Sequence, residues 1–183
     1  MRKTFSIAFY TANLTAVILF WARGASSLLS AGGPAALLAI ARLAGLLAGY
    51  ALLTQIILIG RVLWVEQAFG LDRLSRAHHW NGFALLAFAL IHPLLTNAAY
   101  AALNGVAVFE QVLFFLRTYS VVLLAEIGVI LFLLIFLLSL GALRKRLTYE
   151  QWYALHLVAY MALALAFFHQ VIVGGDLAGQ GAF

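Results

Sequence analysis

The sequence contains no cysteine among its 183 residues. Disulfide bonds, thiolate metal sites, iron–sulfur clusters and covalently attached c-type haem all need cysteine, so these features are excluded. Any metal bound by the protein must therefore be held by histidine nitrogens or by oxygen ligands.

Charged residues are also scarce. They make up 9% of the chain, against 66% hydrophobic residues, and the mean hydropathy is +1.05. Soluble domains have about 25% charged residues, so water is not the main solvent of this protein. In lipid the backbone must satisfy its own hydrogen bonds, which apolar stretches of about 20 residues do as helices. The composition predicts an all-α integral membrane protein whose first partner is the lipid bilayer.

Five apolar segments are each about long enough to cross a bilayer. They span residues 5–21, 43–63, 80–101, 119–143 and 152–173. The loops between them are too short for a further folded domain, so residues 1–183 are expected to form one bundle of five transmembrane helices. Segment 5–21 has a second interpretation as a signal peptide, because it follows two basic residues and precedes several small ones.

The basic residues lie mostly at the ends of the apolar segments, although the net charge of +5 would suit nucleic acid in a soluble protein. We therefore expect no nucleic-acid partner and interpret them as topology signals. Eight lie on one side of the predicted membrane: Arg2, Lys3, Arg61, Arg73, Arg76, Arg144, Lys145 and Arg146. The other side has Arg23, Arg42 and Arg117. The positive-inside rule then predicts a multi-pass cell-membrane protein with a cytoplasmic N-terminus.

All five histidines gather at two of these segments. His78 and His79 directly precede segment 80–101 and His92 lies within it, whereas His156 and His169 lie within 152–173. One histidine in a membrane helix often only bonds to a neighbouring helix. Two matching pairs instead indicate a cofactor. The 14-residue step from His78 to His92 covers about 21 Å and falls about 40° short of whole turns, which places both imidazoles in one crevice at different depths.

The second pair matches the first in depth and less well in direction. The 13-residue step from His156 to His169 covers about 20 Å but falls about 140° short of whole turns. A local distortion such as a π-bulge, or imidazoles that leave the helix on different sides, would be required. Because both helices run from inside to outside, His156 is expected to pair with His78, and His169 with His92. His79 is the competing candidate for the place of His78.

Each pair can supply two axial imidazoles to one haem iron, which closes the iron to direct oxygen binding and favours electron transfer. Arg73 and Arg76 lie just before His78, where arginines could pair with haem propionates. A purely topological role explains these two arginines equally well.

The histidines stand in stretches that resemble the ferric reductase-like transmembrane family, which includes ferric reductases and the catalytic subunits of NADPH oxidases. The resemblance covers most of the chain. It is carried by Gly70-Leu71-Asp72-Arg73-Leu74 leading to His78, by Gly82 and His92, and by Tyr149-Glu150-x-Trp152-x-x-Leu155-His156 with Tyr160 and His169.

The resemblance implies two b-type haems, held by His78, His92, His156 and His169. It implies electron flow from a cytoplasmic flavin and NAD(P)H domain to an external acceptor such as ferric iron or dioxygen. A sixth helix and a fused dehydrogenase domain are also typical of the family, and the sequence shows neither, nor a glycine-rich dinucleotide motif. We therefore expect a C-terminally incomplete haem domain, with FAD and NAD(P)H bound only by a missing domain or a partner.

Two alternatives stay open. In the first, a separate flavoprotein or a quinone supplies the electrons, an arrangement similar to that of the haem-binding membrane subunit of sulfoxide-reductase-type systems. A transporter whose histidines and Glu126 line a proton or metal path is the rival from another class. A transporter would more often have broken helices and acids on several segments, which this sequence lacks.

Overall fold

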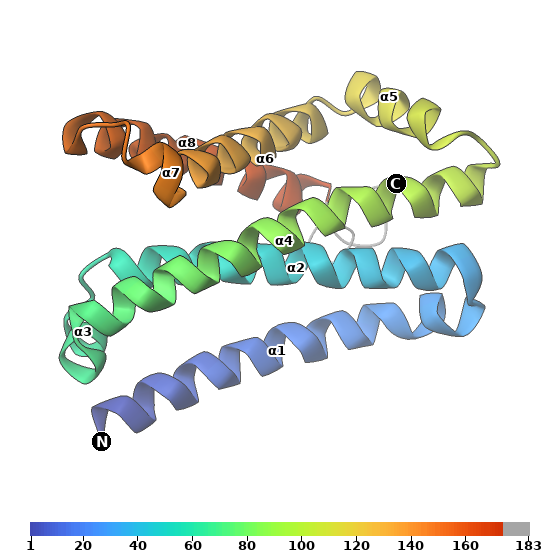
Figure 1. Ribbon diagram of the computed structural model, residues 1–183. Coiled ribbons are helices and arrows are strands. Elements are labelled where there is room, and N and C mark those ends of the chain that lie inside the picture. The colour runs from blue at the N-terminus through green and yellow to red at the C-terminus, as the bar shows by residue number, and fades with distance from the viewer. Residues whose placement is uncertain (174–183) are drawn as a thin grey trace. The chain divides into compact units, whose positions relative to one another are not determined.

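The computed structural model describes residues 1–173, apart from the side chain of Ala142. Every element in this part of the chain is a helix (Figure 1). Five of them are long and apolar enough to cross a membrane: α1 (Arg2–Ala31), α2 (Gly33–Ile59), α4 (Leu71–Asn104), α6 (Ser120–Ser139) and α8 (Tyr149–Ile172). The prediction of an all-α membrane protein is therefore confirmed. The tail on which the expected C-terminal truncation depends, residues 174–183, lies outside the described residues.

The helix ends differ from those expected at the first connection. Helix α1 continues ten residues past the expected end at residue 21, and α2 begins ten residues before the expected start at residue 43. Arg23 and Arg42 therefore lie inside helices and not in a loop. Hydropathy identifies only the apolar part of a helix that faces lipid. The helix itself continues to Ala31 and ends at Gly32, whose φ of 68° is left-handed.

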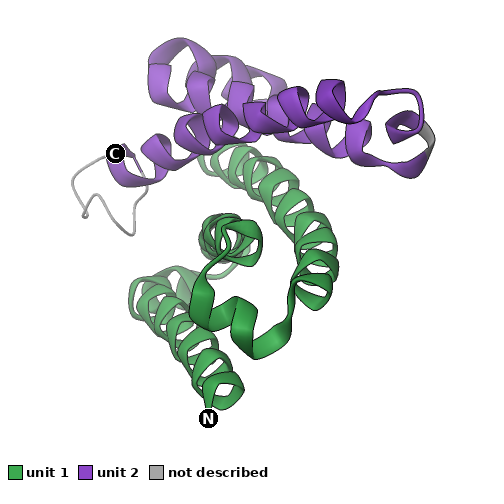
Figure 2. Cartoon of the chain, turned by 90° about the vertical axis from the view of Figure 1, so that its left-hand side faces the viewer, with its two compact units in different colours: residues 1–103 green, residues 104–183 purple. Residues whose placement is uncertain are grey.

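The chain divides into two compact units, residues 1–103 and residues 104–183, which are coloured separately in Figure 2. In the first unit, α2 lies between α1 and α4 (Figure 2). Two bonds join α1 to α2: the indole of Trp21 donates to the carbonyl of Ala39 over 2.8 Å, and the hydroxyl of Tyr50 donates to the carbonyl of Tyr10 over 2.7 Å. Helix α2 buries mainly alanines, which allow its neighbours to approach closely.

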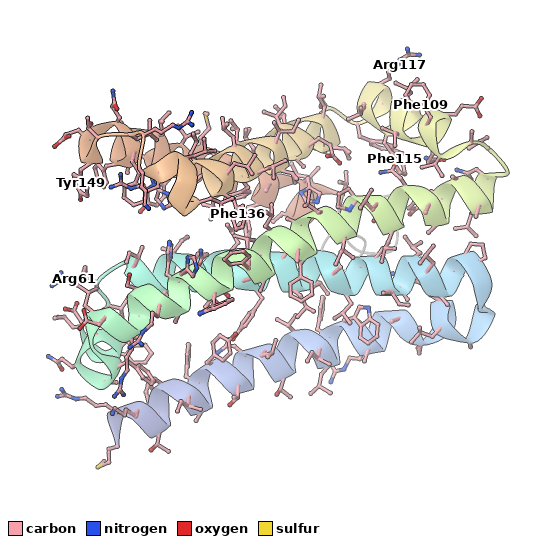
Figure 3. All side chains as sticks on the ribbon, viewed as in Figure 1. Arg61, Phe109, Phe115, Arg117, Phe136 and Tyr149 are labelled. Carbon is pink, nitrogen blue, oxygen red and sulfur yellow. The ribbon has the colours of Figure 1, made fainter. Side chains whose placement is uncertain are left out.

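A short helix, α3 (Leu63–Phe69), packs against the start of α1. The ring of Trp64 contacts the rings of Phe5 and Phe9 at centroid distances of 5.5 and 6.1 Å. Before it, Arg61 adopts a φ of 55° and forms an ion pair of 2.7 Å with Glu66 (Arg61 is labelled in Figure 3). This packing fixes the connection that leads from α2 to α4.

The second unit begins with α5 (Val108–Thr118), an amphipathic helix that the sequence analysis did not predict. Its Gln111 and Phe115 are buried, whereas Arg117 is exposed on the other side of the helix (Figure 3). The Glu110 carboxylate accepts the N–H of Ala107 over 3.2 Å and so caps the first turn. A glutamate at the third position of a helix is a known capping residue, so Glu110 was the sequence signal that could have indicated the start of α5.

Helices α6 and α8 pack closely at Gly128. A Cβ added there would lie 3.0 Å from the carbonyl oxygen of Ala162 and 3.2 Å from the nitrogen of Ala166, both backbone atoms of α8. The two helices touch because position 128 has no side chain, which is the usual way in which small residues allow membrane helices to associate. The turn after α6 contains the short helix α7 (Gly141–Arg144).

We expect Gly128→Leu to weaken the α6–α8 contact by about 1–3 kcal/mol, since the added side chain must push two backbones apart. The free energy of unfolding in mixed detergent micelles measures this loss. Gly141→Leu is the matched control, because no atom lies within 4 Å of a Cβ at that position. Equal stability of the two variants would show that Gly128 does not set the distance between these helices.

Candidate functional site

His92 of α4 is held by two features of α2. Its Nδ1–H donates to the carbonyl oxygen of Ala41, with 2.9 Å between nitrogen and oxygen. One turn further along α2, a Cβ at Gly45 would lie 2.8 Å from Nδ1 and 2.9 Å from Cε1 of the same ring. The imidazole therefore occupies space that any residue other than glycine at position 45 would fill.

The hydrogen bond to Ala41 decides the tautomer of His92. A carbonyl oxygen only accepts, so Nδ1 carries the proton and Nε2 is the basic nitrogen of the ring. Histidines that bind metals commonly donate their other ring N–H to a backbone carbonyl, which orients the ring and raises its basicity as a ligand. His92 thus has the chemistry that a haem iron requires of an axial ligand.

His78 also lies beside α2, near the backbone of Gln55. Gln55 lies 14 residues after Ala41, and His78 lies 14 residues before His92. The two histidines therefore contact α2 at matching positions of an antiparallel register. The expectation that they share one side of α4 agrees with this arrangement.

A polar pair lies one turn after His78. The Asn81 amide donates both to the carbonyl of Ala51 and to the Oε1 of Gln55, each over 2.8 Å. In a membrane such groups must find partners inside the protein, so this pair ties α4 to α2 at the depth of His78. The sequence does not reveal this pair, because an asparagine and a glutamine 26 residues apart form no recognisable pattern.

His79 has different surroundings from His78. It is exposed, and its ring contacts the rings of Trp80 and Phe83 at centroid distances of 5.6 and 5.2 Å. Within the first unit, His78 is the one of the two that interacts with α2. The assignment of His78 as a ligand in place of His79 remains a prediction.

The other two histidines lie on α8, in the second unit. Helix α8 is an uninterrupted α-helix from Tyr149 to Ile172, so the π-bulge considered for the 13-residue step does not occur. His156 and His169 therefore leave α8 in directions that differ by about 140°. The Nδ1 of His169 is hydrogen-bonded to the carbonyl of Ala166, which again makes Nε2 the basic nitrogen.

The charged candidates lie apart from these contacts. Arg73 and Arg76 are exposed in the first two turns of α4, where they can meet an anionic group. Glu126 is half-buried in α6. In the described part of the chain, no three side chains of histidine, aspartate or glutamate are grouped to hold a metal ion, whereas a haem iron takes only two protein ligands.

The family model for the ferric reductase like transmembrane component matches residues 44–167 of this sequence, more than half of its length. The chain belongs to this family. Its members are membrane electron-transfer modules, and their transmembrane domains generally bind haem. The match includes His78, His92 and His156, while His169 lies two residues beyond its end. Searches of curated proteins and of solved structures found no match.

We expect Gly45→Ala to displace the imidazole of His92, because a Cβ at 2.8 Å from Nδ1 cannot be accommodated without movement. In protein labelled with ¹⁵N-histidine, the signal of an Nδ1-protonated ring should give way to a mixture of tautomers. Gly82→Ala is the control, since a Cβ there meets only the Nε2 of Gln55 at 3.2 Å, the end of a flexible side chain. An unchanged His92 signal in Gly45→Ala would refute the role assigned to Gly45.

Proposed function

We propose that this protein carries electrons across the bilayer through two b-type haems. His78 and His156 would ligate the haem nearer the cytoplasm, called the inner haem here, and His92 and His169 the haem nearer the outside, called the outer haem. Haem supplies reversible one-electron chemistry at its iron when bound. The observation that carries the proposal is the hydrogen bond from His92 to Ala41, which prepares Nε2 as a ligand.

The donor chemistry of the histidines supports the proposal. His92 and His169 both donate Nδ1–H to a backbone carbonyl, so Nε2 is the nitrogen with which each neutral ring would bind iron. Two such imidazoles would hold one haem iron between them and leave no open position for dioxygen, so the group would supply electron transfer.

The assignment of pairs depends on depth and direction along the sequence. The steps of 14 and 13 residues cover about 21 and 20 Å, so each helix offers one ligand near each face of the membrane. Because α8 is regular, its two imidazoles leave on different sides. The proposal therefore requires that the two haems approach α8 from different sides, while both approach the α2-facing side of α4.

The surrounding charges suit a donor on the cytoplasmic side. We assign Arg73 and Arg76 to the propionates of the inner haem, because arginine pairs with carboxylates through two parallel hydrogen bonds. The donor would be a flavin reductase that uses NAD(P)H, as a further domain or a separate subunit, and the acceptor an external molecule such as ferric iron or dioxygen. We place the protein in the cell membrane with its N-terminus in the cytoplasm.

Purified protein made with ample haem should contain two b-type haems per chain, measured by pyridine haemochrome and by the reduced-minus-oxidised spectrum. Removal of one axial ligand should release one haem or change its coordination, and should leave the other haem in place. Accordingly, His92→Ala and His169→Ala should lose the same spectral component, and His78→Ala and His156→Ala should lose the other.

His79→Ala is the control for this series and should keep both haems. If it lost a haem while His78→Ala kept both, the inner ligand would be His79. Wild-type protein without haem would refute the proposed function and would make a proton or metal transporter the leading hypothesis. Haem that accepts electrons from a quinone or a separate flavoprotein, and not from an NAD(P)H-dependent reductase, would favour the sulfoxide-reductase-type arrangement.

The absence of cysteine allows a direct test of topology. We expect a single cysteine at Lys145 to be shielded from a membrane-impermeant maleimide in intact cells, and one at Phe109, which is 71% exposed, to be labelled. Labelling of both positions after the membrane is permeabilised is the control for accessibility. The opposite pattern would place the N-terminus outside.

A further inference from the structure

Three side chains form a continuous stack at the start of α8. The guanidinium of Arg144 lies over the ring of Trp152, with 4.8 Å from its central carbon to the ring centroid. The ring of Trp152 lies on the imidazole of His156, with 4.9 Å between centroids and 28° between planes. We call these residues the Arg144–Trp152–His156 stack.

The stack is fixed by the local structure on both sides. Thr148 caps α8 by accepting the N–H of Gln151 over 3.3 Å, and Trp152 and His156 then stand one turn apart on the same side of the helix. The Trp152 indole also donates to the hydroxyl of Ser139 in α6 over 3.4 Å. Arg144 is held above the ring by a hydrogen bond of 3.1 Å to the carbonyl of Leu147. The plane of Trp152 is thus determined by α6, α8 and the connection between them.

We propose that the Arg144–Trp152–His156 stack orients the His156 imidazole and raises the reduction potential of the haem that this histidine binds. The inference rests on the proposed function, since it requires His156 to be an axial ligand. It makes Trp152 and Arg144 positioning residues of the inner haem. If Trp152 only anchored the helix at the membrane surface, it would not have to contact either the Arg144 guanidinium or the His156 imidazole.

The effect of Arg144 on the potential follows from charge. Reduction adds one electron and changes ferric to ferrous iron, so it removes one positive charge from the centre. A nearby cation favours the less positive state, and the half-buried Arg144 acts through a medium in which charges interact more strongly than in water. The inner haem would therefore accept an electron more readily from a cytoplasmic donor.

The effect of Trp152 follows from ring geometry. An imidazole bound through Nε2 can rotate about its bond to iron, and its orientation is set by the groups that surround it. A stacked indole restricts that rotation to planes near its own. Loss of the indole should broaden the range of ligand orientations, whereas phenylalanine at the same position can still stack on the imidazole.

The charge is tested by redox titration of the two haems in the purified protein. In Arg144→Gln the equilibrium constant for reduction of the inner haem should fall at least threefold, which is about 28 mV for one electron. Arg144→Lys should restore most of the shift, because it keeps the charge. Arg146→Gln is the matched control. Arg146 lies two residues after Arg144 and is exposed, so this change removes the same charge from outside the stack.

The ring is tested by electron paramagnetic resonance of the ferric protein. Trp152→Leu should change and broaden the low-spin signal of one haem, Trp152→Phe should restore most of the wild-type signal, and both should leave the other haem unchanged. Trp80→Leu removes an exposed tryptophan beside His79 and should change neither signal.

The outcomes separate the two proposals. Two haems with wild-type potentials in Arg144→Gln and a wild-type signal in Trp152→Leu would overturn the role of the stack and leave the proposed function intact. Equal shifts in Arg144→Gln and Arg146→Gln would also overturn it, because they would show only a general effect of charge. Wild-type protein without haem would overturn both.

Discussion

The hydrogen bond from His92 to the carbonyl of Ala41 is the contact on which the interpretation of this protein depends. It crosses from α4 to α2, selects the ring tautomer and requires glycine at position 45 to make room for the imidazole. A carbonyl in a helix already accepts a bond from its own helix, so this second bond uses its remaining lone pair. The orientation and tautomer of this imidazole are thus set by the backbone of α2, without a second polar side chain.

The fold could be predicted from the sequence because lipid leaves the chain few options. Apolar runs of sufficient length must be helices, and the five long helices follow from that constraint. The ends of α1 and α2 were misplaced because hydropathy measures contact with lipid, whereas helices end where the backbone turns, as at Gly32. Helix α5 was missed because it is short and amphipathic, and no apolar run marks it.

The candidate site was predictable in part. The spacing of His78 and His92 correctly predicted that they share one side of α4, whereas the role of the histidines as haem ligands stays a prediction. The residues that surround them were not predictable: Gly45, the Asn81–Gln55 pair and the bond from Trp152 to Ser139 each depend on the register between two helices. Register is set by interlocking side chains across a helix pair, and a single sequence does not reveal which residues of two helices face each other.

The register between α2 and α4 limits how the sequence of this protein can change over evolution. Ala41 and Gln55 are separated by 14 residues, as are the two histidines that interact with them. An insertion of one residue between Ala41 and Gln55 would turn one contact about 100° away from α4 while the other stayed in place. A substitution along this pair of helices keeps the register, although Gly45 admits no side chain, whereas a change in the length of either helix would shift it.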